Sequence, residues 1–453
     1  MVQIRRIPTG CSTINGLMAD LQPFRALRYD LERVSPAQVV TQPYDKISPA
    51  MQDRYYAASP YNLVRIILGR REAGDDASSN VYSRAADCFG EWRRSWVLQQ
   101  DRNPSIYVYS QCFTVPGSTN EFERRGFIAL GRIEDYSAGV IFRHEQTLAK
   151  PKADRLELLR ATRAHFGQIF MLYEDSGQVE SLLDMRGDPD IELGDEYGVK
   201  HRLWQVTDAK VIQSIQAAMK DRKLIIADGH HRYETALNYR DECRAQDAAQ
   251  TGNRKLSSSE FVMMTFVNMN SHGLRILPTH RVVYGLDSFS EEKFRSSAQA
   301  FFDIDEIEFA LTADSALAIL REAGRTGSSI LAVTSARAFL MHHCNFYAAA
   351  QIFAGSSIRQ QALDVVQLHK CLLENVLQLS EESIRNQKNI SYVREASDAL
   401  SQVREGRANI VFLMNPCRVA QVRDIAFAGE VMPQKSTDFY PKLLSGLTIY
   451  ALD

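Results

Sequence analysis

The feature that most constrains the fold of this chain is a short apolar run that leads directly into a compact polar segment. Leu224 to Ala227 (LIIA) has the composition of a buried strand, and Asp228 to Arg232 (DGHHR) follows it without a spacer. The residues from Tyr233 to Asn238 then favour a helix. A strand, a tight glycine-containing loop and a helix in this order predict an α+β fold, or mixed α/β fold.

The rest of the chain predicts several domains. At roughly 150 residues per domain, 453 residues correspond to about two or three. Ser105 to Thr114 and Arg125 to Arg132 flank a Pro-Gly turn, which predicts a β-hairpin, and Asn62 to Leu68 (NLVRIIL) also reads as a strand. We divide the chain into a leader at 1–20, an N-terminal α/β region at 21–100, a central core at 101–290 and a C-terminal α/β domain at 291–453.

Charge and cysteine usage exclude several classes of function. The formal net charge is −2, which argues against binding nucleic acid over a broad surface. The seven cysteines show no CxxC spacing and the ten histidines no HExxH motif, so we expect neither a disulfide framework nor a zinc site. The sequence has no secretory signal and no run of 18 apolar residues. We therefore expect a cytoplasmic protein with no membrane and no nucleic-acid partner.

The segment from Asp228 to Arg232 has the residue types of an anion site. A loop that opens a helix presents free backbone N–H groups and the positive end of the helix dipole. Gly229 would let the backbone approach a phosphate closely. The side chains that follow add hydrogen-bond donors: His230, His231 and Arg232. Asp228 could hold Mg²⁺ or accept a proton. The alternative is a structural turn in which Asp228 caps the helix and Arg232 pairs with a carboxylate.

A second candidate segment, Arg143 to Arg155, begins with a histidine beside a carboxylate, His144-Glu145. Three cations follow Glu145 within ten residues: Lys150, Lys152 and Arg155. Phosphoryl transfer needs both a base near the attacking hydroxyl and positive charge around the transferring group. The alternative is a solvated loop that leads into a helix.

Two further polar stretches contain groups that could contact a phosphate. Met432 to Lys442 (MPQKSTDFYPK) lacks the GxxxxGK[ST] pattern of a Walker loop, but Lys435 with the next two hydroxyl residues could touch phosphate. An ordinary loop is the alternative. The other stretch is an N-terminal polar cluster: Arg25, Arg28, Tyr44 and Asp45. A further hypothesis is that the N-terminal and C-terminal parts of the chain close over the central loop.

Five separated motifs of the chain resemble those of a large bacterial family catalogued as domain of unknown function 1015. In order along the chain they are PFRALRYD, QPYDKIS, RHEQTLAKPKADR, ADGHHRYETAL and MPQKSTDFYPKLLSGL. The resemblance extends from about Pro23 to the C-terminus, which is nearly the whole chain.

The DGHHR loop is also similar to the phosphate-binding loop of the ParB/sulfiredoxin-like fold, which includes partition-protein nucleotidases, sulfiredoxin and free-serine kinases. In those kinases a His-Glu pair lies upstream of an Asp-Gly-His-His-Arg loop, and here His144-Glu145 precedes Asp228 to Arg232 in the same order. The resemblance implies that residues 101–290 are a ParB/sulfiredoxin-like nucleotide-binding core. It also implies a kinase that moves the γ-phosphate of ATP, or the terminal phosphate of ADP, to the hydroxyl of free L-serine.

The same resemblance implies roles for individual residues. Glu145 would orient or deprotonate the serine hydroxyl, and Asp228 would be the second acidic group, acting on the hydroxyl or on Mg²⁺. The phosphate ligands would be Gly229, His230, His231 and Arg232. From their charge alone, we add three groups that could neutralise the charge developing in transfer: Lys150, Lys152 and Arg155. His144 and Lys435 are further candidates.

Other functions remain open at this point. A ParB-like nucleotide switch or nucleotide hydrolase would use the same loop without a small-molecule acceptor, and a non-enzymatic scaffold would use it only as a turn. A sulfiredoxin-type reductase needs a cysteine in the loop, and residues 228–232 contain none. The expected partner is a small molecule, with serine favoured over threonine, a sugar or an inositol. The sequence does not predict the oligomeric state.

Overall fold

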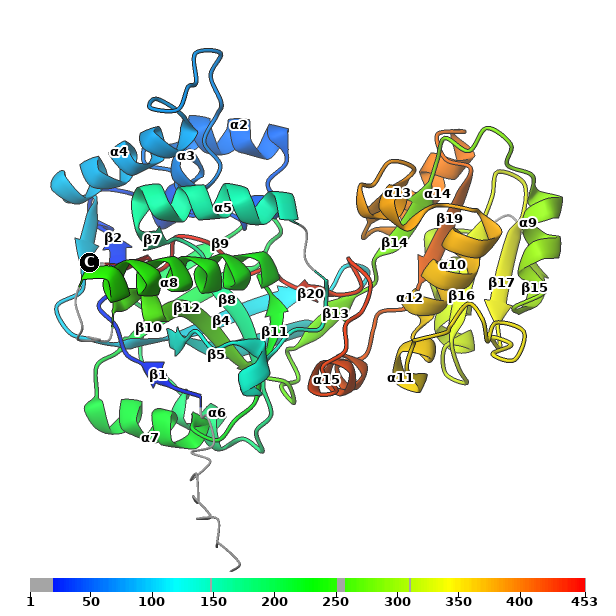
Figure 1. The fold of residues 1–453 in the computed structure, drawn as a ribbon. Coiled ribbons are helices and arrows are strands. Elements are labelled where there is room, and N and C mark those ends of the chain that lie inside the picture. The colour runs from blue at the N-terminus through cyan, green and yellow to red at the C-terminus, as the bar shows by residue number, and fades with distance from the viewer. Residues whose placement is uncertain (1–18, 147–148, 251–256, 309–310, 453) are drawn as a thin grey trace, which may run out of the picture.

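The computed structural model of the chain describes residues 19–146, 149–250, 257–308 and 311–452. These residues form two lobes (Figure 1). The first lobe is built on a nine-stranded sheet and the second on a six-stranded sheet, so the mixed α/β class expected from the sequence is confirmed. Most of the leader predicted at 1–20 lies outside the described residues.

The nine-stranded sheet of the first lobe mixes parallel and antiparallel pairs. The strand order is β6-β11-β8-β12-β5-β4-β10-β9, with β1 paired to β5. Strands β4 (Ile106–Thr114) and β5 (Glu121–Arg132) pair antiparallel, which confirms the predicted hairpin. The remaining strands are β1 (Leu21–Gln22), β6 (Ile141–Phe142), β8 (Ile169–Tyr173), β9 (Ile191–Gly194), β10 (Lys200–Val206), β11 (Leu224–Asp228) and β12 (Phe261–Asn268).

Strand β8 shows how this sheet is buried on both faces. All five of its residues are buried, and successive side chains point to opposite faces. Ile169 and Met171 pack in a cluster that includes α7 (Ala209–Met219), whereas Phe170 packs in a different cluster with Leu444 from near the end of the chain. A strand covered on both faces has a continuous apolar sequence rather than an alternating one, as β8 does.

The prediction of a strand at Asn62–Leu68 is wrong, because this segment contains helix α3 (Val64–Ile67). The side chain of Asn62 accepts a hydrogen bond from the backbone N–H of Val64 at 2.9 Å, which favours a turn at this point. The apolar residues of the segment are buried and pack against α4 (Val81–Arg94). The composition favours a strand, but packing against a neighbouring helix decides the outcome.

The other helices of the first lobe include two whose starts have a local cause in the sequence. Ser48 accepts a hydrogen bond from the backbone N–H of Met51 and caps the helix that follows. The helix after the DGHHR loop begins at His230, earlier than the periodicity indicated, because the loop itself forms its first turn. These helices are α1 (Pro36–Val39), α2 (Pro49–Ala58), α5 (Ala149–Thr162), α6 (Gln178–Leu182) and α8 (His230–Gln250).

The second lobe is an antiparallel sheet with the order β15-β17-β16-β19-β14-β18. Its strands are β14 (His280–Val283), β15 (Asp303–Ile307), β16 (Ser329–Val333), β17 (Ala338–His342), β18 (Ile390–Val393) and β19 (Ile410–Met414). Its helices are α9 (Glu291–Ala298), α10 (Ala313–Ala323), α11 (Ile358–Gln361), α12 (Asp364–Gln367), a π-helical segment (Leu368–Val376), α13 (Glu381–Arg385) and α14 (Ala396–Arg404), and α15 (Val419–Phe427) lies between the lobes (Figure 1).

The chain crosses between the lobes twice. Strand β13 (Arg275–Leu277) leads out of the first lobe, and β20 (Asp438–Tyr440) returns to it and pairs with β13. Strand β21 (Tyr450–Ala451) then pairs with β7 (Ala164–His165) of the first lobe. The second sheet therefore begins at β14, upstream of the boundary expected at residue 291, and the last residues of the chain belong to the first lobe. The partners of β14 are β18 and β19, which lie far along the chain, so sequence patterns do not reveal this boundary.

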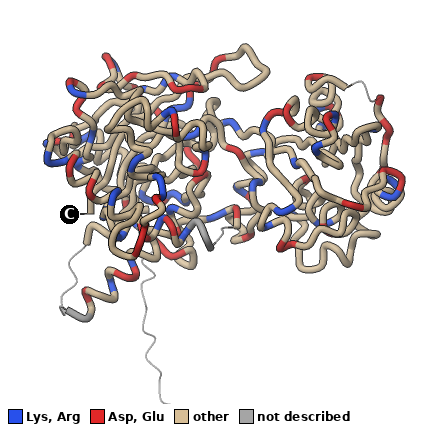
Figure 2. The backbone as a smooth tube through the Cα atoms, turned by 90° about the horizontal axis from the view of Figure 1, so that it is seen from above, with Lys and Arg blue, Asp and Glu red and all other residues tan. Residues whose placement is uncertain are grey.

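Charged residues of both signs are intermixed over both lobes (Figure 2). This distribution agrees with the small net charge of −2. Within the part of the chain that the structure describes, no helix is both long enough and apolar enough to cross a membrane.

Candidate functional site

Two segments that are far apart in the sequence meet at one edge of the first sheet because their strands are neighbours. Strands β6 and β11 pair in parallel, so their carboxyl ends lie at the same edge. His144 and Glu145 follow β6, and the DGHHR loop follows β11. At this edge the structure has a cleft of about 480 Å³, which the two lobes line together.

Several distant parts of the chain converge on this cleft. The central sheet contributes Glu145 and the DGHHR loop, and the second lobe contributes residues around β18. The side chains that line the cleft include Tyr44, Asp45, Lys46, Tyr392, Arg394, Lys435, Thr437, Asp438 and Lys442. Lys435 and Arg232 lie on the same cleft, so the C-terminal segment is close to the central loop, as the hypothesis of closure requires.

The DGHHR loop has the predicted strand, loop and helix form. Strand β11 ends at Asp228, Gly229 has a φ of +93°, and α8 begins at His230. The N–H groups of a first helical turn have no partner within the helix, and the helix N-terminus carries a positive partial charge. Because His230 and His231 line the cleft, these donors lie at its wall.

We expect replacement of Gly229 with Ala to lower the stability of the fold. A Cβ atom at this position would lie 3.1 Å from the Arg232 guanidinium, and the positive φ is itself strained for alanine. The expected cost is about 1–2 kcal/mol of folding free energy. A lower Tm in differential scanning fluorimetry would show this effect.

The matched control is Gly194→Ala at the end of edge strand β9. A Cβ atom there meets nothing within 4 Å, and the position has no positive φ. We expect this variant to keep the Tm of the wild type. If Gly229→Ala behaves like the control, the loop does not need its glycine.

Asp228 is held between two cations. Its Oδ2 accepts a hydrogen bond from Arg232 Nη2 at 2.7 Å, and its Oδ1 lies 3.2 Å from Lys442 Nζ. Burial alone would raise the pKa of Asp228, but the charges of Lys442 and Arg232 outweigh burial and hold this pKa well below its usual range. Arg232 also donates to the backbone oxygen of Gln168. If the loop were only a structural turn, Arg232 was expected to pair with a carboxylate. Such an ion pair is present, and the carboxylate is that of Asp228.

Asp438 gathers a second set of cations across the cleft. Its Oδ1 lies 3.0 Å from Lys442 Nζ and 3.9 Å from Lys46 Nζ, and its Oδ2 lies 2.7 Å from Arg394 Nη2. Burial opposes ionisation, but the charges of Lys442 and Lys46 hold the pKa of Asp438 well below its usual range. Lys442 thus bridges two carboxylates, Asp228 and Asp438.

Sequence reasoning did not single out the residues around Asp438. Lys46 lies in QPYDKIS and Lys442 in MPQKSTDFYPKLLSGL. A lysine close to an aspartate in both motifs is the signal that could have identified them. Arg394 lies in no quoted motif, and only the fold brings it to the cleft.

His144 and His230 form a buried pair behind the loop, with ring centroids 4.8 Å apart. The Nδ1 of His144 lies 2.8 Å from the backbone oxygen of Ile226 and must donate, because a carbonyl only accepts. Its Nε2 lies 2.9 Å from the Thr437 hydroxyl, which therefore donates to the neutral ring. Burial lowers the pKa of His144 to about 4 and that of His230 well below its usual value. Both rings are neutral at pH 7, and His144 connects the C-terminal segment to β11.

Glu145 has one anchored oxygen and one that is available. Its Oε1 accepts a hydrogen bond from the backbone N–H of Lys435 at 2.9 Å, and its Oε2 makes no hydrogen bond to any described residue. Burial raises the pKa of Glu145, and the nearby charge of Lys435 opposes this only in part. A carboxylate with a raised pKa and an available oxygen is suited to accept a proton near neutral pH.

The structure does not bring Lys152 or Arg155 into the cleft lining. Lys152 Nζ lies 2.8 Å from Glu234 Oε2, and Arg155 pairs with the adjacent Asp154. Both residues lie on α5. Lys152 faces α8, and Arg155 donates a hydrogen bond to the backbone oxygen of Ile67 in α3. The side chain of Lys150 lies outside the described residues. The cleft takes its positive charge from Lys435 and from the residues around Asp438 instead.

The N-terminal polar cluster is divided by the fold. Tyr44 and Asp45 line the cleft. Arg28 pairs with Asp101 at 2.7 Å, and Arg25 donates to the backbone oxygen of the same residue. The two arginines therefore hold the N-terminal segment in place, outside the cleft lining.

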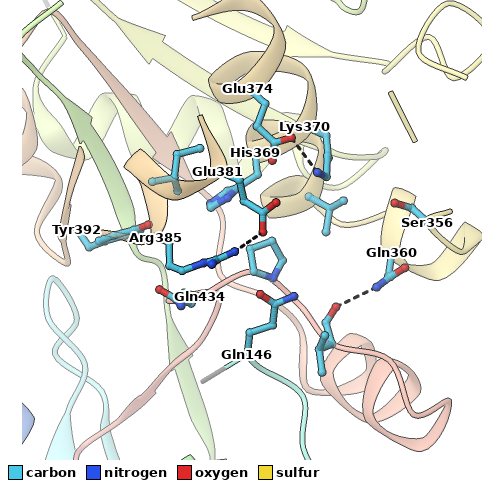
Figure 3. Close-up of a pocket in the computed structure, with 14 residues that line it drawn as sticks. Gln146, Ser356, Gln360, His369, Lys370, Glu374, Glu381, Arg385, Tyr392 and Gln434 are labelled. Atoms are coloured by element: carbon cyan, nitrogen blue, oxygen red, sulfur yellow. Dashed lines mark hydrogen bonds and ion pairs between the residues drawn. The ribbon is translucent and has the colours of Figure 1, made fainter. Parts of the chain in front are cut away.

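A smaller cavity of about 150 Å³ adjoins the cleft on the side of the second lobe (Figure 3). Gln146 and Tyr392 line both spaces. Two ion pairs lie along its wall, Lys370 with Glu374 and Arg385 with Glu381, each at 2.8 Å (Figure 3). The cleft therefore continues from the neighbourhood of Glu145 into the second lobe.

The carboxylate expected to hold Mg²⁺ does not fit that role as it stands. Mg²⁺ needs hard oxygen ligands with free coordination positions, but both oxygens of Asp228 are occupied by cationic side chains. Among the described residues, the group with metal-ligand spacing is in the second lobe, outside the cleft lining: Asp303, His342 and His343.

Residues 21–366 match a protein family described as "Protein of unknown function (DUF1015)". The sequence matches no curated protein. Among solved structures, a free serine kinase in complex with AMP is 13% identical, with a TM-score of 0.34, over 68% of this chain and 89% of its own. A conserved hypothetical protein from Pyrococcus furiosus is 12% identical, with a TM-score of 0.32, over 66% and 87%. SbnI from Staphylococcus aureus with a C-terminal truncation is 10% identical, with a TM-score of 0.34, over 71% and 87%. At such low TM-scores these likenesses do not identify the function of this chain.

Proposed function

The chain belongs to the DUF1015 family, whose function is unknown, and from the chemistry of its cleft we propose that it is a small-molecule kinase. The proposed reaction transfers the γ-phosphate of ATP to the hydroxyl of free L-serine and yields O-phosphoserine and ADP. The observation that carries the proposal is the position of Glu145 and the DGHHR loop after two adjacent parallel strands, at one cleft. A proton acceptor beside a phosphate-binding loop is what phosphoryl transfer requires.

In this proposal the nucleotide phosphates bind at the N-terminus of α8. The backbone N–H groups of the first turn would donate to phosphate oxygens, and Gly229 would allow their close approach. Arg232 and Lys442 lie beside this turn, already oriented by Asp228. Fixed cations of this kind stabilise the charge that spreads over the transferring group. The resemblance of the loop also supports a ParB/sulfiredoxin-like type for the core at 101–290.

Glu145 is the proposed proton acceptor. The serine hydroxyl oxygen attacks the γ-phosphorus while the bond from that phosphorus to the bridging oxygen of ADP breaks, and the hydroxyl proton passes to Glu145. Its available Oε2 and its raised pKa support this role. The lowered pKa of Asp228 makes it a poor base, so we assign it to positioning the two cations instead.

The acceptor would bind on the side of Glu145 that faces the second lobe. The adjoining cavity of about 150 Å³ corresponds to roughly five water molecules, which suits a small polar molecule. Its wall carries both signs of charge, as recognition of a free amino acid with an ammonium and a carboxylate group requires.

The test is a search for the phosphorylated product. Purified full-length protein is incubated with ATP, Mg²⁺ and a pool of free amino acids and polyols, and the products are identified by mass spectrometry. We expect O-phosphoserine, and ADP in place of ATP would test the other donor. A different phosphorylated product would keep the kinase and correct the acceptor. Nucleotide hydrolysis without any phosphorylated acceptor would favour the switch or hydrolase, and no turnover would contradict both.

A further inference from the structure

A second large cavity lies in the second lobe, behind the segment that borders the cleft. Its volume is about 650 Å³, within the range of small-molecule sites. The loop at 324–328, between α10 and β16, forms one wall, and the residues that follow β19 form another. Helix α15 begins at the cavity, where Arg418 and Gln421 line it.

The lining of this cavity is strongly cationic. Four arginines line it, Arg281, Arg321, Arg325 and Arg418, against one carboxylate, Asp364. Arg325 pairs with Glu322 at 2.8 Å. Arg281, Arg321 and Arg418 form no ion pair with any residue that the structure describes. Three guanidinium groups without an ion pair, against one carboxylate, favour a negatively charged occupant of this cavity.

Arg281 is the most unusual of these cations because it is only 2% exposed. Its Nη1 donates to the backbone oxygen of Thr279 and its Nη2 to that of Lys435 at 3.1 Å. Its Nε has no hydrogen-bond partner among the described residues. A buried cation without a carboxylate partner, and with an unused donor, is costly unless an anion completes its surroundings.

We propose that this second cavity binds a small molecule that carries an oxyanion, either a phosphate or a carboxylate group. Arg281 lies at the buried end of the site, and the exposed Arg321 and Arg418 lie at its opening. The hydroxyl group of Ser328 and the N-terminus of α15 add donors on the wall. The guanidinium fork suits both kinds of oxyanion.

The second cavity and the cleft share a thin wall made of consecutive residues. Lys435 and Thr437 line the cleft, whereas Ser436 lines the second cavity. The backbone of Lys435 connects the two sites, because its oxygen accepts from Arg281 and its N–H donates to Glu145. An occupant that moves Arg281 would therefore shift the partner of Glu145. This effect on turnover rests on the proposed function, whereas anion binding in the second cavity does not.

The test measures anion binding to the full chain while ADP occupies the cleft. Inorganic phosphate and succinate are titrated separately by calorimetry. A comparison of their affinities distinguishes a phosphate ligand from a carboxylate ligand. We expect at least one of them to bind. The double variant Arg321→Gln, Arg418→Gln should weaken this binding at least about tenfold, since hydrogen bonds to charged groups are lost. The affinity for ADP should not change.

Two further variants make the result decisive. Arg423 lies on α15, pairs with Asp424 and lies outside the cavity lining. The variant Arg423→Gln should therefore bind the anion like the wild type. Arg281→Met should abolish anion binding if it folds, and the double variant carries the test if it does not. Binding of neither anion, or equal binding by the double variant, would overturn the proposal. If ADP does not bind, the proposed function fails. The comparison of phosphate binding between the wild type and the double variant still decides whether the second cavity binds an anion.

Discussion

Replacement of Glu145 with Gln is expected to lower kcat about 1000-fold while the KM for ATP stays within about twofold. Glutamine keeps the shape of the side chain and can still accept the hydrogen bond from the Lys435 N–H, so the cleft should retain its geometry. It cannot take up the proton of the attacking hydroxyl. Steady-state kinetics with coupled detection of ADP would measure both constants.

The pH profile separates a lost proton acceptor from a disturbed fold. Burial raises the pKa of Glu145, so in the wild type kcat should rise with pH through that raised pKa as the carboxylate forms. The residual activity of Glu145→Gln should lack this acid limb. Glu242→Gln is the control, because Glu242 lies on α8 but pairs with Arg160 away from the cleft. A Glu145→Gln enzyme with kcat within tenfold of the wild type would remove Glu145 from the chemistry.

Replacement of Lys442 with Met is expected to reduce the free energy of unfolding by about 3 kcal/mol and to abolish turnover. Lys442 is largely buried and lies between Asp228 and Asp438, within 3.2 Å of both. Without it, two carboxylates face one another with fewer cations. Urea denaturation followed by circular dichroism would measure the loss of stability.

The sign of the pH dependence tests this explanation. Nearby cations, Lys442 foremost, lower the pKa of Asp228 and Asp438, so both stabilise the fold above the unfolded pKa of about 4 and lose that contribution as the pH falls. The difference in stability between the wild type and Lys442→Met should be largest near pH 7 and shrink in acid, where the carboxyl groups take up protons. Lys210→Met, at an exposed site on α7, should show little difference at any pH. A difference that is independent of pH would point to lost packing instead of lost charge.

Local patterns were enough to predict the elements that carry the phosphate loop. The apolar run before Asp228 predicted a strand, which is β11. Gly229 predicted a turn and has a positive φ, and the periodicity after the loop predicted a helix, which is α8. The hairpin of β4 and β5 was equally local, because a short turn joins neighbouring strands. These features depend on residues that are close in sequence.

What the sequence could not predict depends on pairing between distant segments. Glu145 meets the loop because β6 lies beside β11, and Arg394 reaches the cleft because β18 belongs to the edge of the second sheet. Charge alone suggested Lys152 as a phosphate ligand, but the orientation of α5 pairs it with Glu234. Residue type indicates what a side chain can do, whereas tertiary packing decides which partner it meets.

The return of the last strands to the first lobe sets an order of events during synthesis on the ribosome. All strands of the second sheet, β14 to β19, are made before β20 and β21, so the second lobe can fold while the first still lacks its final strands. The segment from Lys435 to Lys442, which contains β20, also emerges after the second sheet and supplies cations to a cleft whose loop was made much earlier. A nascent chain therefore carries an unfinished cleft until the second lobe and this segment have been translated.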